Sequence, residues 1–187
     1  MRAAEKNLLI AVRDRLRSVN DWTDEQCQVE HDEVAPAVAG NLYVVVMTGG
    51  WTPGPRHRTS GGVSDLIYSV DVSVAKRVAN VPKDRLRNVF LHNLDSLDEE
   101  LDKVYRVVDW GGEPDEDGDY PLMRLANALI LEETGSEQGF VEPLKFSSIE
   151  RRPRIVGGEL FSAKSGQPQV GMVRTMSFTG ARRITHK

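Results

Sequence analysis

The stretch VSDLIYSVDVSVAKRV, residues 63–78, alternates apolar and polar side chains more clearly than any other part of this chain. One side of the alternation is formed by Leu66, Tyr68, Val70, Val72 and Val74. Because successive side chains of a strand point to opposite faces, the pattern predicts one long β-strand with a single apolar face. The predicted strand is longer than an ordinary one, and we expect it to project beyond its own sheet.

The residues before this strand predict its antiparallel partner. NLYVVVMT (41–48) is a continuous β-branched run, which is typical of a strand buried on both faces. Between the two strands lies MTGGWTPGPRHRTSGGVS (47–64), which is rich in glycine and basic residues. A phosphate-binding loop would need to lead into a helix, and here a strand follows. We therefore expect a long, protruding hairpin loop that acts as a contact arm, with Trp51, Arg56, His57 and Arg58 as contact residues. The alternative is a flexible connector without a contact role.

Helical periodicity appears on both sides of the hairpin. Apolar residues recur at spacings of three and four over 3–19 and again over 81–110, where Asp84 is a candidate N-cap. Pro121 is expected to open a further helix that runs to about Glu133 and ends at Gly135. Short alternating segments at 25–31, 144–158 and 169–185 add strands. The order predicts an α+β fold with a mainly antiparallel sheet and helices on one face.

Length and composition indicate one domain of class α+β over residues 1–187, in which the acidic loop and extra helix at about 109–135 form an addition. The chain has one cysteine, Cys27, which excludes an intrachain disulfide and a multi-thiol metal site. No segment resembles a signal peptide or a membrane span. No nucleophile elbow or paired metal ligands occur, so we expect no enzyme activity, no metal and no cofactor.

The loop GGEPDEDGD (111–119) has a partial resemblance to a calcium-binding loop in its spacing of carboxylates. Glu113, Asp115 and Asp117 take the first, third and fifth positions, and Gly118 takes the sixth. The twelfth position, which must supply a bidentate carboxylate, is Arg124. We therefore interpret the segment as a solvated acidic loop.

Charge is distributed unevenly, although the formal net charge is only −4. Between residues 95 and 119 there are eleven Asp or Glu against two Lys or Arg, and between 145 and 187 there are nine basic residues against two acidic ones. Two opposite poles would favour head-to-tail contact between copies, although two solvated faces without a partner explain the pattern equally well. The basic region adds these candidate contact residues: Arg151, Arg152, Arg154, Arg182 and Arg183. It could also contact nucleic acid, although it lacks interleaved aromatic residues.

The amphipathic first helix, APAVAGNLYVVVMTGGWTPGP (35–55), the long strand with VDVSVAKRVANVP (70–82) and the helix after it together resemble the tail terminator, or tail completion, proteins of tailed bacteriophages. The resemblance covers the order of elements through about residue 108. It implies a small α+β domain that closes into a ring, usually a homohexamer, without catalytic residues.

This resemblance implies a structural virion protein of the phage neck, assembled in the host cytoplasm. The ring would cap the tail tube, end its polymerisation and join it to the head connector or stopper protein. Genomic DNA would pass through the lumen without specific binding, and no membrane would be involved. Two alternatives stay open: a head–tail adaptor or stopper, and a nucleic-acid-binding accessory protein that uses the basic C-terminal region.

Overall fold

The computed structural model describes residues 2–30, 41–55, 62–78, 86–109, 114, 116–156 and 171–185. The helices are α1 (Arg2–Asn20), α2 (Leu86–Val108) and α3 (Pro121–Thr134). The strands are β1 (Cys27–Val29), β2 (Leu42–Pro53), β3 (Val63–Arg77), β4 (Lys145–Ile149), β5 (Arg154–Val156) and β6 (Gly171–Thr185). This confirms the predicted α+β class, with a sheet that is antiparallel except where β1 pairs with β2.

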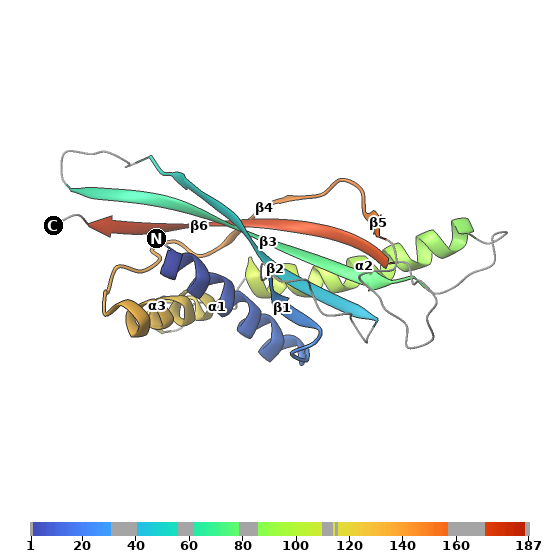
Figure 1. The fold of residues 1–187 in the computed structure, drawn as a ribbon, viewed down its shortest axis with the longest axis horizontal. Coiled ribbons are helices and arrows are strands. Elements are labelled where there is room, and N and C mark those ends of the chain that lie inside the picture. The colour runs from blue at the N-terminus through green and yellow to red at the C-terminus, as the bar shows by residue number, and fades with distance from the viewer. Residues whose placement is uncertain are drawn as a thin grey trace.

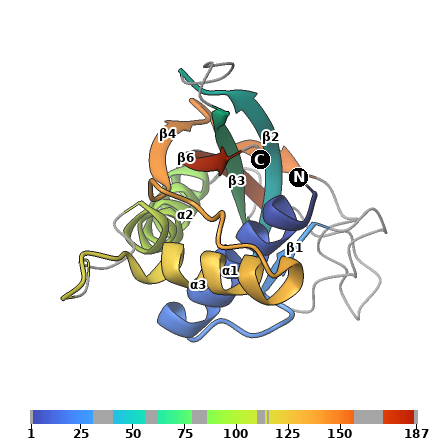
Figure 2. The same cartoon turned by 90° about the vertical axis from the view of Figure 1, so that its left-hand side faces the viewer.

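The sheet has the strand order β1-β2-β3-β6-β4, and β5 also pairs with β6. The two longest strands, β3 and β6, form its central pair, which runs in register from Val63 opposite Thr185 to Arg77 opposite Gly171. All three helices lie on one face of the sheet (Figures 1 and 2). The expectation that this strand projects beyond its own sheet is wrong, because β6 pairs with β3 along its whole length. The two strands together reach further along the long axis than α1 and α3 (Figure 1).

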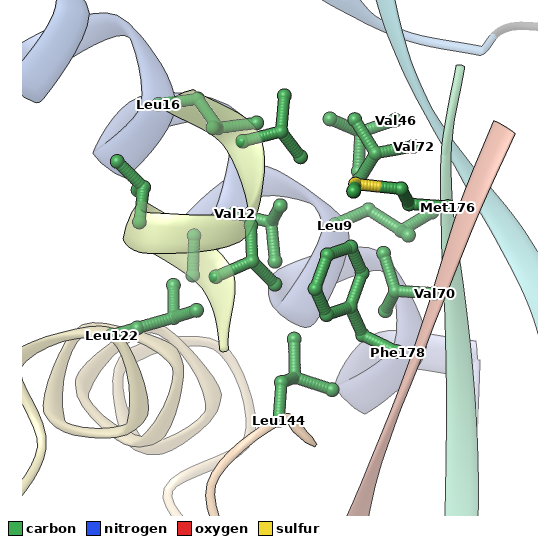
Figure 3. Close-up of a cluster of buried hydrophobic side chains, with 14 of the residues drawn as sticks. Leu9, Val12, Leu16, Val46, Val70, Val72, Leu122, Leu144, Met176 and Phe178 are labelled. Carbon is green, nitrogen blue, oxygen red and sulfur yellow. The ribbon is translucent and has the colours of Figure 1, made fainter. Parts of the chain in front are cut away.

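The core lies between the helices and the apolar side of β3 that the sequence predicted. Tyr68 and Val72 of β3 and Phe178 of β6 are almost completely buried there. Figure 3 shows Val12 and Leu16 of α1 with Val70, Val72 and Phe178 in this cluster. Val19, which the periodicity placed on the same face of α1, is exposed in the last turn of the helix. A smaller apolar cluster occupies the other face of the sheet and consists of Tyr43, Ala75 and Val173, with Val45 against it.

Both ends of α3 lie where local sequence signals placed them. Pro121 is in the first turn, where its missing N–H costs no helix hydrogen bond. Gly135 has a φ of 63°, and its N–H donates to the Leu131 carbonyl at 2.8 Å. For α2 the described part begins at Leu86, and the predicted cap Asp84 lies outside the described residues.

The segment after α3 is fastened to the helix by one side chain. Asn127 accepts a hydrogen bond from the Phe140 N–H at 2.6 Å and donates one to the Phe140 carbonyl at 3.1 Å. Gly139 lies so close that a Cβ there would be 2.3 Å from Asn127 Oδ1. This contact fixes the segment between α3 and β4, from which the chain continues into β4 beside β6.

Candidate assembly surface

Part of the glycine-rich stretch is strand where the sequence predicted loop. β2 continues to Pro53, and Trp51 lies opposite Tyr68 of β3. A register shift between Thr48 and Gly50 marks a bulge, where Gly50 has a φ of 81°. The strands predicted over 41–48 and 63–78 are confirmed, and the prediction of a loop between them is wrong for residues 49–53. A sequence rich in glycine and proline obscures a strand whose pairing is imposed by its long neighbour β3.

The far part of β2, Thr48–Pro53, forms one edge of the sheet, and we call it the open β2 edge. β1 covers only residues 44–46, where the Val44 N–H donates to the Gln26 carbonyl at 2.6 Å. No other described strand pairs with the outer side of β2. Trp51 is 39% exposed here, and at the start of this edge the Thr48 hydroxyl donates to Glu5 of α1.

The direction of the peptide groups on this edge follows from one hydrogen bond. The Gly54 N–H donates to the Asp65 carbonyl at 2.8 Å, so Asp65 of β3 faces β2. Antiparallel strands alternate between residue pairs that exchange hydrogen bonds and pairs that do not. Counting back from Gly54, Trp51 and Tyr68 form a pair that does not exchange hydrogen bonds. Trp51 therefore directs its N–H and C=O away from β3, toward the open side of β2.

The opposite edge of the sheet, formed by β4, is blocked at Phe146. The Phe146 N–H donates to Asp109 Oδ1 at 2.5 Å, and Lys145 Nζ donates to the Asp109 carbonyl at 3.4 Å. A register shift between Phe146 and Ser148 also breaks the ladder. Bulges and capped peptide groups are the devices by which proteins prevent unwanted pairing at an edge. The two edges of this sheet are thus chemically different.

β5 lies at the other end of β6, and no described strand pairs with its outer side, so it forms a second open edge among the described residues. The Glu150 N–H donates to the Thr175 carbonyl at 3.0 Å, so Thr175 faces the β4 and β5 side of β6. By the same alternation, the N–H and C=O of Arg154 face Val173 of β6. The N–H and C=O of Ile155 then point away from β6. The Ile155 side chain is 65% exposed. The sequence analysis missed Ile155, because exposure of an apolar strand residue depends on whether another strand covers it.

Three of the predicted basic contact residues bind groups of the same chain. Arg183 Nε donates to Asp65 Oδ1 at 2.9 Å, and Arg154 Nε lies 3.2 Å from Glu150 Oε1. Arg182 is only 8% exposed, and its Nε donates to the Gln138 carbonyl at 2.9 Å. Arg151 and Arg152 are exposed in the turn between β4 and β5. Arg56, His57 and Arg58 lie outside the described residues.

The acidic and basic regions seen in the sequence meet in the folded chain at one ion pair. Arg174, from the basic C-terminal region, donates to Asp98 of the acidic region at 2.9 Å. Folding therefore neutralises part of both regions at these two residues. In the acidic loop, Arg124 Nη2 lies 3.8 Å from Asp117 Oδ2 and 4.0 Å from Asp119 Oδ2, so the residue at the twelfth position brings a positive charge to these carboxylates.

Cys27 and the possible metal ligands were the remaining candidates for a chemical role. Burial raises the pKa of the Cys27 thiol to about 12, despite the opposing charges of Arg17 and Arg13. The thiol is therefore protonated and unreactive at neutral pH. Within the part of the chain that the structure describes, no three His, Cys, Asp or Glu residues gather in a way that could hold a metal ion.

A hollow of about 290 Å³ lies on the surface beside α3. Its charged lining includes Asp119 and Arg124, which contact one another, and Glu137. The hollow is open to solvent and lined by both polar and apolar groups.

Comparison with protein-family models and with curated proteins finds no match for this sequence. None of the described helices is both long enough and apolar enough to span a bilayer.

Proposed function

We propose that this protein is a structural component of a bacteriophage neck that assembles into a ring, caps the tail tube, ends its polymerisation and joins it to the head connector. The observation that carries the proposal is the open β2 edge, where a long strand with an exposed tryptophan continues past β1. An unpaired edge of this kind is a template for pairing with another chain.

The differences between the sheet edges support a head-to-tail contact. The β4 edge is capped by Asp109, whereas the β2 edge is open among the described residues. A contact between two unlike surfaces of the same chain propagates from copy to copy, and it closes into a ring when the rotation per step allows. We take a homohexamer as the expected size, on the resemblance to tail terminator proteins.

The face of the sheet opposite the helices has polar side chains that suit a lumen through which DNA passes without specific binding. Ser69, Asp71, Thr175, Ser177 and Thr179 share this face and are half-buried. These side chains are small hydroxyl groups around one carboxylate, and they do not form a cluster of cations that could bind DNA phosphates. DNA could therefore slide along this face without being held. Arg183 on the same face is already paired with Asp65.

The internal use of the arginines supports an assembly role over the nucleic-acid-binding alternative. Arg154, Arg174 and Arg183 each contact a carboxylate of the same chain. Phosphate binding at these side chains would have to displace that carboxylate. A head–tail adaptor or stopper uses the same kind of contact surface, and differs from the terminator in which neck partners it joins.

The mass of the native protein tests the ring. Light scattering and native mass spectrometry should give a discrete multiple of the 20.8 kDa chain, and electron microscopy should show annular particles. A protein that stays a single 20.8 kDa particle at high concentration, alone and with tail tubes, would contradict the proposal.

Tail length tests the capping activity. In the phage that encodes the protein, loss of the chain should give tail tubes of uncontrolled length that fail to join heads. Tubes of normal length joined to heads would contradict the terminator role. Tubes of normal length without heads would favour the adaptor or stopper.

Measuring the affinity for generic duplex DNA distinguishes the proposed ring from a nucleic-acid-binding accessory protein. For the proposed ring we expect weak binding at physiological salt. Submicromolar affinity with a steep decrease as salt rises would favour the nucleic-acid-binding protein instead.

A further inference from the structure

We infer that the open β2 edge of one copy pairs antiparallel with β5 of the next copy, with Trp51 directly opposite Ile155. This inference rests on the proposed ring and names the two strands that would join its subunits. It follows from the directions, faces and free peptide groups of the two edges.

The backbone of each edge has what the other needs. Trp51 directs its N–H and C=O away from β3, and Ile155 directs its N–H and C=O away from β6. Two such residues placed opposite one another exchange both hydrogen bonds, as in the hydrogen-bonded pairs of any antiparallel ladder. β2 and β5 also run in opposite directions within the sheet order, so antiparallel pairing extends the sheet without reversing it.

The side chains of the two residues fall on the same face. Trp51 lies opposite Tyr68 and Ile155 lies opposite Met172, and both Tyr68 and Met172 belong to the core on the helix side of the sheet. Trp51 is 39% exposed and Ile155 is 65% exposed, so the pairing would cover two large apolar groups. An aromatic side chain opposite a β-branched one is among the favourable cross-strand pairs.

Two prolines limit the register. With Trp51 opposite Ile155, Pro53 lies opposite Pro153, and neither residue has an N–H to continue the ladder. The contact is therefore short and specific in position. A short contact is compatible with a ring, because two such contacts must break before a subunit leaves a closed ring.

The occupant of each edge is a second copy because one chain carries both halves of the contact. The open β2 edge and β5 lie toward opposite ends of the long axis (Figure 1). Since the surfaces differ, each copy can bind one neighbour through β2 and another through β5. The β4 edge is not an alternative partner, because the Phe146 N–H already binds Asp109.

Cysteine crosslinking tests the register. Thr52 and Arg154 would be neighbours in a non-hydrogen-bonded pair, with Cα atoms about 4.5 Å apart, which suits a disulfide. Oxidation of the Thr52→Cys, Arg154→Cys variant should give a ladder of covalent multimers. Each single variant should give no ladder, since the native Cys27 is buried. The Thr52→Cys, Ser147→Cys variant is the matched control at the blocked β4 edge.

A charge at the edge provides a second test. Trp51→Lys should weaken assembly at least tenfold, measured by the concentration at which multimers dissociate, with an unchanged circular dichroism spectrum. Val19→Lys, at an exposed apolar site at the end of α1, should leave assembly unchanged.

The outcomes separate the two proposals. A covalent ladder together with loss of assembly in Trp51→Lys supports the β2–β5 contact. A ring that forms without this ladder, or that crosslinks equally through Ser147→Cys, overturns the contact and leaves the ring in place. A protein that forms no multimer at all overturns the ring and the contact together.

Discussion

Arg174 of β6 lies with its Nη1 atom 2.9 Å from Asp98 Oδ1 of α2, across 76 residues of sequence. The same guanidinium donates through Nε to the Glu150 carbonyl at 2.9 Å. One side chain thus joins α2, β6 and the end of β4 on the helix side of the sheet. It also explains why the basic region has fewer free cations than its composition suggests.

Replacing Arg174 should cost more stability than replacing its partner. Arg174→Ala removes both hydrogen bonds and should lower the free energy of unfolding by about 1–2 kcal/mol. Asp98→Ala removes one, from a carboxylate that is 47% exposed, and should cost less than about 1 kcal/mol. Urea unfolding of both variants measures the difference. Equal losses would mean that the bond to Glu150 contributes nothing.

Glu100 on α2 should be more sensitive than other carboxylates of the same helix. Its side chain is 11% exposed and lies 3.4 Å from Lys76 Nζ and 2.9 Å from Lys103 Nζ. Glu100→Ala leaves Lys76 poorly solvated without its counter-charge, and should cost about 2–3 kcal/mol. The control is Asp102→Ala, which breaks an exposed pair with Arg106 and should cost under about 1 kcal/mol. Thermal unfolding of both variants checks this ranking.

Loss of the Asn127 side chain should loosen the segment that leads into β4. Asn127→Ala leaves the N–H and C=O of Phe140 without their partner, which should cost about 2 kcal/mol. We expect faster hydrogen exchange at residues 138–142, whereas exchange in α1 should stay slow. The packing of Phe140 against Tyr68, at 5.3 Å between ring centroids, does not depend on the Asn127 side chain. Unchanged exchange in this segment would show that the aromatic contact alone holds it.

Stability should fall at alkaline pH because of Cys27. Its pKa is about 12 in the folded chain and 9.0 when unperturbed, so above pH 9 the unfolded state loses a proton that the folded state keeps. This contribution is fully present below pH 9 and decreases by about 1.4 kcal/mol for each pH unit between 9 and 12. The decrease with pH should be smaller in Cys27→Ala than in the native protein. Parallel curves for the two proteins would contradict the assignment.

The sequence by itself determined the elements whose signals are local. The alternation at 63–78 predicted β3 and its buried face, because a strand exposes alternate residues whatever its partners are. Pro121 and Gly135 fixed the ends of α3, because each acts on the backbone of its own turn. The α+β class followed from the order of these elements.

Only the tertiary structure decided how far β2 extends, which edges stay open and which charges remain free. Trp51 belongs to a strand because β3 pairs with it, although glycines and prolines surround it in sequence. Asp109 closes the β4 edge and Asp98 binds Arg174 through contacts between distant parts of the chain. Periodicity records which way a side chain points, whereas edges and ion pairs depend on which segment lies beside it, and the chain sets that only when it folds.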